Sequence, residues 1–303
     1  MKILVTGGSG FIGSHVVRHY QGRAEIVVLD NLRTGERGHL DGLACRFVEG
    51  SILDRDLVDE LMTGTDFVFH LAALVSVPES VASPFETVEI NVRGLLNVLE
   101  SARQHRAKKL VFASSAAVYG ENPTDPKSET LPPDPRSPYA VTKLDGEYYC
   151  ALYAREGWLP TAALRFFNVF GPGQNPLSAY AAAVPIFLQR ARAGEPLVVH
   201  GDGGQTRDFI YVQDIVEALA LAAEKPSPQG SFNAGCGQAI SILELAREIV
   251  RLTGSSSSIE FGPLRPGDLR HSTADPRKLF AEGWRPRFDI SVGLKMLTAA
   301  ITK

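Results

Sequence analysis

The chain has 303 residues, of which 44% are hydrophobic, enough to fill the core of one large domain or two ordinary ones. Its formal charge of −3 shows no global basic character, which argues against nucleic acid as a main partner. No apolar run reaches the roughly 18 residues that a bilayer requires, so we expect no membrane partner.

The cysteines suggest a reducing compartment. Cys45, Cys150 and Cys236 are odd in number and widely spaced, and they form no metal or redox motif. We interpret them as structural thiols and expect a cytoplasmic protein without a bound metal. The opening residues MKILVTGG are expected to form a strand and a glycine turn rather than a signal peptide.

The first part of the chain alternates short apolar runs with longer segments of helical period. Continuous runs of Val, Ile, Leu and Phe predict parallel strands that are covered on both faces. Strands are expected at 2–7, 25–30, 45–50, 66–73, 109–115 and 161–171. Helices are expected at 11–20, 54–63, 86–105 and 139–156. This alternation indicates βαβ units and predicts an α/β fold with a Rossmann-type doubly wound parallel sheet.

The pattern becomes less regular after residue 171. We expect helices at 181–193, 212–224 and 241–254, and strands at 196–201 and 230–235. Pro185 is expected to kink the first of these helices or to delay its start. The last helix is amphipathic and is closed by Gly254. We therefore predict a first domain over 1–170 and a smaller α/β lobe over 171–303, with segments near 208–235 returning to the first domain.

A glycine-rich turn follows the first predicted strand and opens a helix. In TGGSGFIG, the residues Gly7, Gly10 and Gly13 allow a tight turn and let a pyrophosphate approach the helix N-terminus. Asp30 ends the second strand, at the separation expected of a carboxylate that binds a ribose diol. This carboxylate would repel a 2′-phosphate, so the sequence favours NAD over NADP. Arg33 lies nearby, so NADP remains an alternative cofactor.

The stretch SPYAVTK holds Tyr139 and Lys143 four residues apart. Positions i and i+4 share one face of a helix, and Pro138 suits a first helical position. Taken alone, such a pair would usually be an ordinary surface pair. Its meaning therefore depends on the other motifs.

Taken together, these motifs resemble the extended short-chain dehydrogenase/reductase family, and within it the nucleotide-sugar epimerases and dehydratases. The resemblance is greatest to the UDP-glucose and UDP-N-acetylglucosamine 4-epimerases. It covers residues 5 to 275 and is carried by TGGSGFIGSH, VVLDNL, HLAA, FASSAAVYG, SPYAVTK, LRFFNVFGPGQ, RDFIYVQDIV and RPGDLRHSTAD.

The resemblance implies a catalytic trio of Ser115, Tyr139 and Lys143. Lys143 would bind the nicotinamide ribose, and its charge, with that of NAD⁺, would favour the Tyr139 phenolate. A free tyrosine titrates near about 10, so a base that works at neutral pH needs such help. Ser115 would hydrogen-bond the reacting sugar oxygen, although the neighbouring Ser114 is an alternative.

The resemblance also implies a cofactor site that is larger than the glycine turn. Ser51 replaces the aspartate that the family usually places near the adenine, which would weaken one contact. The implied NAD contacts are Gly7, Gly10, Phe11, Ile12, Gly13, Asp30, Asn31, Ser51, Ile52, Leu71, Ala72, Ala73, Tyr139, Lys143 and Phe166.

Ala116 and Ala117 bear on the type of reaction. Dehydratases of the family usually carry acidic residues at these positions, because elimination of water needs a general acid. Alanine cannot transfer a proton, so the sequence disfavours elimination. The resemblance then implies a UDP-hexose 4-epimerase that works through a transient 4-keto sugar and NADH.

The implied substrate contacts lie mostly in the second half. Arg207 and Arg265 would hold the diphosphate, because guanidinium groups bind phosphate oxygens bidentately. Asn168 would assist them, and Asp268 would hold the uridine ribose. The implied substrate-binding set is Ser76, Ser115, Asn168, Val184, Val198, His200, Arg207, Arg265, Asp268 and Ser272, with Val198 and His200 at the uracil.

Ser272 bears on substrate size. Epimerases restricted to non-acetylated sugars carry a bulky tyrosine at the matching position, whereas serine leaves space at C2. We therefore expect interconversion of UDP-GlcNAc and UDP-GalNAc, with UDP-Glc and UDP-Gal also accepted. The alternatives are a UDP-uronate 4-epimerase, an NAD(P)-dependent nucleotide-sugar reductase and a non-catalytic NAD-sensing protein. The family also implies a homodimer packed through helices 86–105 and 139–156.

Overall fold

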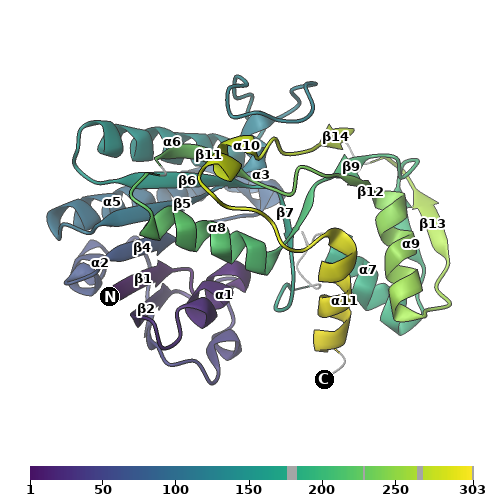
Figure 1. Cartoon of the computed structure of the whole chain (residues 1–303), viewed down its shortest axis with the longest axis horizontal. Helices are drawn as coiled ribbons and strands as arrows, with labels where there is room; N and C mark the ends of the chain where they lie inside the picture. Colours follow the sequence, from purple (N-terminus) through teal and green to yellow (C-terminus); the bar gives the residue numbers. More distant parts are fainter. Residues whose placement is uncertain (176–182, 228, 265–268, 302–303) are drawn as a thin grey trace. The chain divides into compact units, whose positions relative to one another are not determined.

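The computed structural model describes residues 1–175, 183–227, 229–264 and 269–301. The chain divides into two compact units (Figure 1). The first unit comprises residues 1–122, 132–166 and 216–232. The second unit comprises residues 123–131, 167–215 and 233–303.

The first unit is built on a parallel sheet. Within the described residues, seven strands lie in the order β11-β6-β5-β4-β1-β2-β3 (Figure 1). These strands are β1 (Lys2–Thr6), β2 (Glu25–Asp30), β3 (Arg46–Glu49), β4 (Phe67–His70), β5 (Lys109–Ser115), β6 (Thr161–Phe166) and β11 (Gly230–Ala234). The pairings of β1 with β2 and β4, β2 with β3, and β5 with β4 and β6 are parallel. The predicted doubly wound α/β fold is confirmed.

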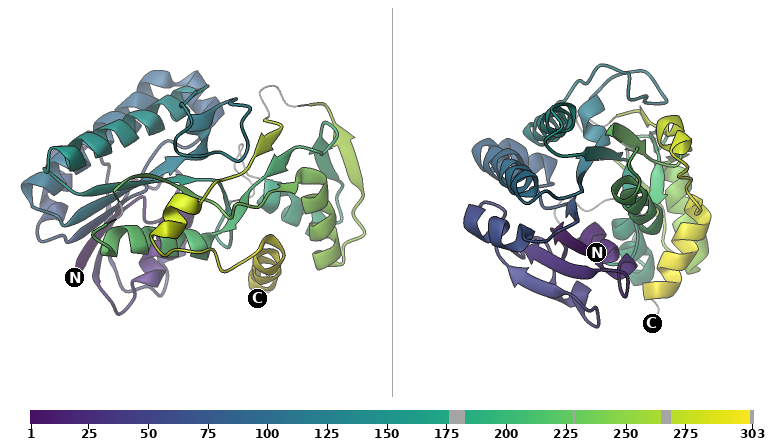
Figure 2. Two further views of the ribbon diagram at one scale, coloured as in Figure 1. Left: turned by 45° about the horizontal axis from the view of Figure 1, so that its top comes forward. Right: turned by 60° about the vertical axis from the view of Figure 1, so that its left-hand side comes forward.

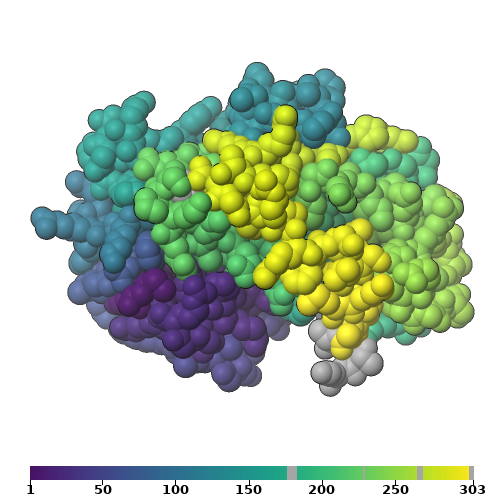
Figure 3. All heavy atoms as spheres, viewed as in Figure 1, coloured from purple at the N-terminus to yellow at the C-terminus, as the bar shows by residue number. Residues whose placement is uncertain are grey.

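Helices cover both faces of this sheet, as Figure 2 shows. On one face, α2 (Arg55–Met62), α5 (Gly94–Gln104) and α6 (Pro138–Arg155) bury apolar side chains against the strands in one cluster. On the other face lie α1 (Phe11–His19) and α8 (Val212–Glu224), which is part of the first unit from Val216 onward. The Tyr20 hydroxyl donates a hydrogen bond to Glu224 at 2.8 Å. Accordingly, α1 and α8 lie side by side in Figure 3.

Helix α6 begins where the sequence predicts. Ser137 is its N-cap, and the Ser137 hydroxyl accepts a hydrogen bond from the Ala140 amide at 3.2 Å. Pro138 occupies the first helical position, where its missing N–H costs nothing. Tyr139 and Lys143 therefore lie within the first two turns of one helix.

The predicted helix over 86–105 is interrupted. It consists of α4 (Pro84–Val88), a π-helical turn (Glu89–Arg93) and α5, and it is preceded by α3 (Val77–Ala82). Within the π-helical turn, the Asn91 side chain bonds the backbone of Leu74. A π-turn adds one residue to the helical repeat, which periodicity alone does not predict.

The second unit holds short strands and four helices within the described residues. Its strands are β7 (Asn168–Phe170), β8 (Leu197–His200), β9 (Thr206–Arg207), β10 (Phe209–Tyr211), β12 (Ile240–Ser241), β13 (Ile259–Gly262) and β14 (His271–Ser272). Its helices are α7 (Ala183–Ala193), α9 (Ile242–Thr253), α10 (Arg277–Ala281) and α11 (Ile290–Ile301). The core of this unit is formed by α7, α9, α11, β8 and β10. Among the helices that the structure describes, none combines the length and apolarity needed to cross a bilayer.

The prediction of a single strand over 161–171 is wrong. The chain leaves the large sheet after β6, and β7 pairs with β10 instead. Phe167 separates the two strands, and its amide donates a hydrogen bond to the Ala234 carbonyl oxygen at 3.2 Å. The apolar run is continuous in sequence, so composition gave no sign of this break.

Candidate active site

The glycine turn lies where the strand order reverses. Gly7 follows β1 with φ of +72°, and a Cβ added there would lie 2.7 Å from the Ala72 amide nitrogen, just after β4. A Cβ on Gly13 would lie 2.2 Å from the Gly7 carbonyl oxygen. The loops after β1 and β4 therefore approach so closely that these positions exclude side chains. In doubly wound folds, ligands bind at such a reversal, outside the carboxyl ends of the strands.

Asp30 is held rigidly beside this turn. It is 7% exposed, and its two carboxylate oxygens accept hydrogen bonds from the amides of Ser9 and Leu32, both at 2.9 Å. The carboxylate is thereby fixed at the end of β2, next to the glycine turn. This placement suits a ribose diol.

Arg33, the residue that left NADP as an alternative cofactor, forms ion pairs with two glutamates. Its guanidinium pairs with Glu86 at 2.5 Å and with Glu79 at 2.7 Å. The hydrogen bonds that Arg33 donates to these two carboxylates raise its pKa. The cation that would attract a 2′-phosphate is thus neutralised by its neighbours, while the Asp30 carboxylate remains.

Other predicted cofactor residues follow the strand ends. The amides of Leu71 and Ala72 donate to the carbonyl oxygen and the hydroxyl of Thr6, at 3.1 and 3.4 Å. The Ser51 hydroxyl accepts a hydrogen bond from the Leu53 amide at 3.2 Å. The remaining residues lie as follows: Phe11 and Ile12 open α1, Asn31 follows β2, Ile52 is buried against Gly94, Ala73 follows Ala72, and Phe166 ends β6.

The three predicted catalytic residues come together at the carboxyl end of β5. Ser115 is the last residue of this strand, and its hydroxyl lies close enough to Tyr139 on α6 to lower the pKa of the phenol. The Lys143 ammonium lies 5.7 Å from the centre of the Tyr139 ring and donates a hydrogen bond to the Ala113 carbonyl oxygen at 2.7 Å. The Ser114 hydroxyl instead donates to Glu147, so Ser115 is the serine that faces the phenol.

Burial dominates the electrostatics of this trio. It raises the pKa of Tyr139, and the nearby Ser115 hydroxyl lowers it only in part. It lowers the pKa of Lys143 to about 8 and that of the nearby His70 to about 3, so His70 is neutral. The lowered pKa of Tyr139 that we expect from Lys143 together with NAD⁺ stays a prediction.

Two predicted substrate residues are neighbours in the second unit. Arg207 on β9 and Ser272 on β14 are register partners of a parallel pair, and Ser272 is 8% exposed. Asn168 lies on β7, and its side-chain amide donates to the Asp208 carbonyl oxygen at 3.2 Å. Asp208 directly follows Arg207 in the sequence, and β9 pairs with β14. These contacts therefore connect β7, β9 and β14.

The remaining predicted substrate residues are dispersed. Val198 and His200 lie on β8, and His200 Nδ1 contacts the Pro263 carbonyl oxygen at 3.0 Å. Val184 is 1% exposed within the core of the second unit, and the Ser76 hydroxyl caps α3. A substrate contact for either residue stays a prediction. Arg265 and Asp268 lie outside the described residues.

Comparison with known proteins identifies the family. Residues 3–235 match the NAD dependent epimerase/dehydratase family. The chain belongs to this family. It is 37% identical over 302 residues to the UDP-glucose 4-epimerase of Mycolicibacterium smegmatis, covering 97% of this chain and 96% of that protein.

Solved structures agree with this assignment. The UDP-N-acetylglucosamine 4-epimerase of Methanobrevibacter ruminantium, in complex with UDP-N-acetylmuramic acid, superposes with a TM-score of 0.96 at 36% identity and 99% and 98% coverage of the two chains. The UDP-glucose 4-epimerase of Thermus thermophilus, in complex with NAD, gives 0.91 at 38% identity, with 100% and 99% coverage. The predicted enzyme class and its cofactor NAD are confirmed.

The residues of this epimerase/dehydratase chain fit NAD. The glycine turn leaves no room for side chains where the pyrophosphate would approach, and α1 presents its N-terminus there. The Ser9 hydroxyl is buried in the same turn, and among the described residues it has no hydrogen-bonding partner. Asp30 would supply the carboxylate for the adenosine ribose.

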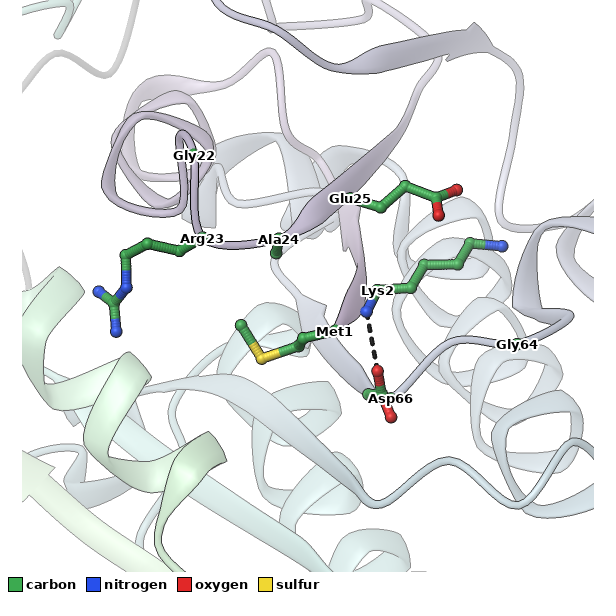
Figure 4. A pocket seen from close by; sticks show the side chains of 8 residues that line it. All are labelled: Met1, Lys2, Gly22, Arg23, Ala24, Glu25, Gly64 and Asp66. Atoms are coloured by element: carbon green, nitrogen blue, oxygen red, sulfur yellow. Dashed lines mark hydrogen bonds between the residues drawn. The ribbon is translucent and has the colours of Figure 1, made fainter.

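A surface concavity of about 610 Å³ lies at the opposite edge of the sheet, lined by residues such as Met1, Arg23 and Glu25 (Figure 4). Its Asp66 carboxylate accepts a hydrogen bond from the Lys2 amide at 2.8 Å. It lies at the amino ends of β1, β2 and β4, away from the edge where this fold binds ligands. Among the described residues, no cluster of His, Cys, Asp and Glu could hold a metal ion.

Sequence reasoning missed two buried groups around the trio. The first is Glu147, which pairs with Arg165 at 2.7 Å. Its position four residues after Lys143, on the same helix face, could have indicated it. The second is Asn91, whose amide donates to the Thr142 hydroxyl at 3.0 Å, and this hydroxyl in turn donates to the Tyr139 carbonyl oxygen at 2.8 Å. No local pattern indicates that contact.

Proposed function

We propose that this chain is a UDP-hexose 4-epimerase that interconverts UDP-GlcNAc and UDP-GalNAc and also accepts UDP-Glc and UDP-Gal. The observation that carries the proposal is the meeting of Ser115, Tyr139 and Lys143 at the carboxyl end of β5. We assign NAD to the first unit and the main contacts with the UDP-sugar to the second. Free thiols at all three cysteines support a cytoplasmic enzyme.

Each residue of the trio has one task. Tyr139 takes the proton from the C4 hydroxyl of the sugar and later returns it. Ser115 holds the reacting oxygen by a hydrogen bond beside the phenol. Bound NAD supplies the hydride acceptor and donor, and its positive charge adds to that of Lys143 in favouring the phenolate over the effect of burial.

The residues after Ser115 support epimerisation over dehydration. Ala116 and Ala117 open the 3₁₀ turn Ala116–Tyr119 and carry no proton-transferring group. Elimination of water would need a general acid there. Hydride transfer to bound NAD and its reversal need no general acid beyond the trio.

The substrate assignment rests on the second unit. We propose that Arg207 binds the diphosphate and that Ser272, its register partner, borders the sugar at C2. The small side chain of Ser272 leaves room for an N-acetyl group. The Methanobrevibacter relative named for UDP-N-acetylglucosamine supports this choice.

We also propose a homodimer. Several large apolar side chains are exposed on α3, α4 and α6, and α3 and α4 pack against α6. They are Val81, Phe85, Val88, Val141 and Tyr148, with Phe85 at 89% exposure. An exposed apolar surface of this kind is typical of a protein interface.

The direct test is a turnover assay of the purified protein with five UDP-sugars, read by chromatography. We expect both hexose pairs to interconvert with no net change in NADH absorbance, because the cofactor is regenerated in each cycle. Net oxidation of added NAD(P)H would indicate a reductase. Turnover of UDP-glucuronate alone would indicate a uronate enzyme, and no turnover of any UDP-sugar would contradict the proposal.

A further inference from the structure

A buried ion pair lies behind the catalytic trio. Glu147 on α6 and Arg165 on β6 are 4% and 5% exposed. Each oxygen of the Glu147 carboxylate accepts one hydrogen bond from Arg165, at 2.9 and 2.7 Å. Each also accepts one from a serine: Oε1 from Ser114, and Oε2 from Ser231 at 2.8 Å.

This network connects directly to the catalytic residues. The last three residues of β5 all face α6: the Ala113 carbonyl oxygen accepts a hydrogen bond from Lys143, the Ser114 hydroxyl donates one to Glu147, and the Ser115 hydroxyl lies near the Tyr139 phenol. Arg165 extends the network beyond the strand. Its guanidinium lies 4.8 Å from the centre of the Tyr119 ring, in the 3₁₀ turn that follows Ser115.

Stability alone is a weak reason for such a pair. Burying two charges carries a desolvation cost, and well-packed apolar residues of similar volume are often as stabilising or more so. A polar network does something that apolar packing does not, since directional hydrogen bonds select one arrangement of the elements that they join. Here these elements are β5, α6, β6 and β11.

We propose that the Glu147–Arg165 pair is the positioning unit of the active site: through Ser114 it fixes the end of β5 against α6, so that Ser115 and Tyr139 keep their contact. The inference rests on the proposed function for its kinetic test. Glu147 and Arg165 touch neither substrate nor cofactor in this scheme, so they are positioning residues. Misplacing reacting groups by about 1 Å can cost about a hundredfold in rate, so such a unit would matter.

Two serines provide a matched test. Ser114→Ala removes the bond from Glu147 to β5, whereas Ser231→Ala removes the equivalent bond to β11 and leaves β5 attached. We expect Ser114→Ala to lower kcat about tenfold or more with KM little changed, and Ser231→Ala to keep kcat within about twofold. Equal effects of the two substitutions, or no loss with Ser114→Ala, would overturn the proposal.

A second measurement needs no substrate. The ionisation of Tyr139 is followed by phenolate absorbance with NAD bound. For each protein, the absorbance of its Tyr139→Phe counterpart is subtracted. Because the nearby Ser115 hydroxyl lowers the pKa of Tyr139, we expect Ser114→Ala to raise the midpoint and Ser231→Ala to leave it unchanged. An unchanged midpoint in Ser114→Ala would also overturn the proposal. If the wild type turned over no UDP-sugar, the proposed function would fail while this titration still tested the positioning unit.

The surroundings of Tyr139 support this readout. Burial lowers the pKa of His70 to about 3, so His70 is neutral throughout the range in which a tyrosine titrates. The charged groups on α6 are Lys143, Asp145, Glu147 and Arg155. The elements packed against α6 carry Glu79, Glu86, Glu89, Arg93, Glu100, Arg103, Lys109 and Arg165. Lys143 is present in every variant, so its contribution cancels in the comparison.

A paired substitution separates positioning from folding. Glu147→Met together with Arg165→Met replaces the ion pair by apolar groups of similar size, which buried sites often tolerate. We expect this variant to keep its circular dichroism spectrum and its NADH affinity while kcat falls at least about tenfold. A folded double variant with wild-type kcat would contradict the proposal.

Discussion

The Lys143 ammonium lies 5.7 Å from the centre of the Tyr139 ring, and one helical turn of α6 separates the two residues. Lys143 is 3% exposed, so its charge is buried beside a phenol whose own pKa is raised by burial. The pKa values of both groups therefore differ from those in water. Perturbations of this kind are typical of catalytic groups.

The first prediction concerns the phenol. Tyr139→Phe removes the group that carries the proton and keeps the ring, so we expect an unchanged fold and bound NAD. Turnover should fall by at least about a hundredfold, the usual scale for an acid–base group. Initial rates with UDP-GlcNAc, alongside fluorescence of bound NADH, check this. Turnover near that of the wild type would refute the assignment.

The second prediction concerns the stability cost of Lys143. Burial lowers its pKa from 10.5 to about 8, so the folded protein holds the charged form unfavourably at pH 7. Lys143→Met should therefore abolish turnover but stabilise the NAD-free protein by roughly 1–3 kcal/mol at pH 7.

The sign of the pH dependence follows from the two pKa values. Between pH 8 and 10.5 the unfolded chain binds more protons at Lys143 than the folded one, so wild-type stability rises with pH in this window. The difference in free energy of unfolding between Lys143→Met and the wild type should therefore shrink as the pH rises from 8 to 10.5. Urea unfolding at pH 7 and pH 9.5 measures the difference, and a constant advantage would contradict the prediction.

The parts of the site that the sequence predicted depend on local spacing. Gly7 and Asp30 could be located because a turn and a strand end have residue types of their own. Tyr139 and Lys143 could be related because four residues make one helical turn. The structure confirms the parallel sheet that brings the ends of β1, β2 and β5 to one edge.

The parts that the sequence did not predict depend on distant pairings. β9 and β14 have two residues each and exist because Thr206 and Arg207 pair with His271 and Ser272. So short a segment has no periodicity to detect. The choice between Ser114 and Ser115 likewise depended on Glu147, which comes from another element.

The third prediction concerns the cofactor. NAD(H) should be released on denaturation, and Asp30→Asn should lower the preference for NADH over NADPH about tenfold, or ~1.4 kcal/mol. The reason is that Asp30 is the carboxylate that would repel a 2′-phosphate, while Arg33 is paired with Glu79 and Glu86. Titration of protein fluorescence with each nucleotide measures both affinities.

The control for this substitution lies on the same strand. Glu25→Gln removes a carboxylate at the other end of β2, so it should leave the preference unchanged. Extraction of mainly NADP(H) from the wild type, or equal shifts in both variants, would show that Asp30 does not set the preference.

The fourth prediction concerns assembly. Phe85→Glu places a charge on the exposed apolar surface of α3, α4 and α6, so we expect the proposed dimer to dissociate. Phe261→Glu changes another exposed aromatic residue, on β13 in the second unit, and should have no effect. Light scattering after size-exclusion chromatography gives the mass of each. A monomeric wild type would remove the basis for the proposal.

The last prediction concerns substrate size. Ser272 is 8% exposed and pairs in register with Arg207, the proposed diphosphate ligand, so a larger side chain there should intrude on the sugar. Ser272→Tyr should abolish turnover of UDP-GlcNAc and UDP-GalNAc while sparing UDP-Glc and UDP-Gal, because overpacking a filled site is costly. Ser272→Ala keeps the space and should turn over both pairs. Rates with all four substrates decide the matter. Equal loss on both pairs in Ser272→Tyr, or a wild type that is inactive on the acetylated pair, would show that another residue sets the size limit.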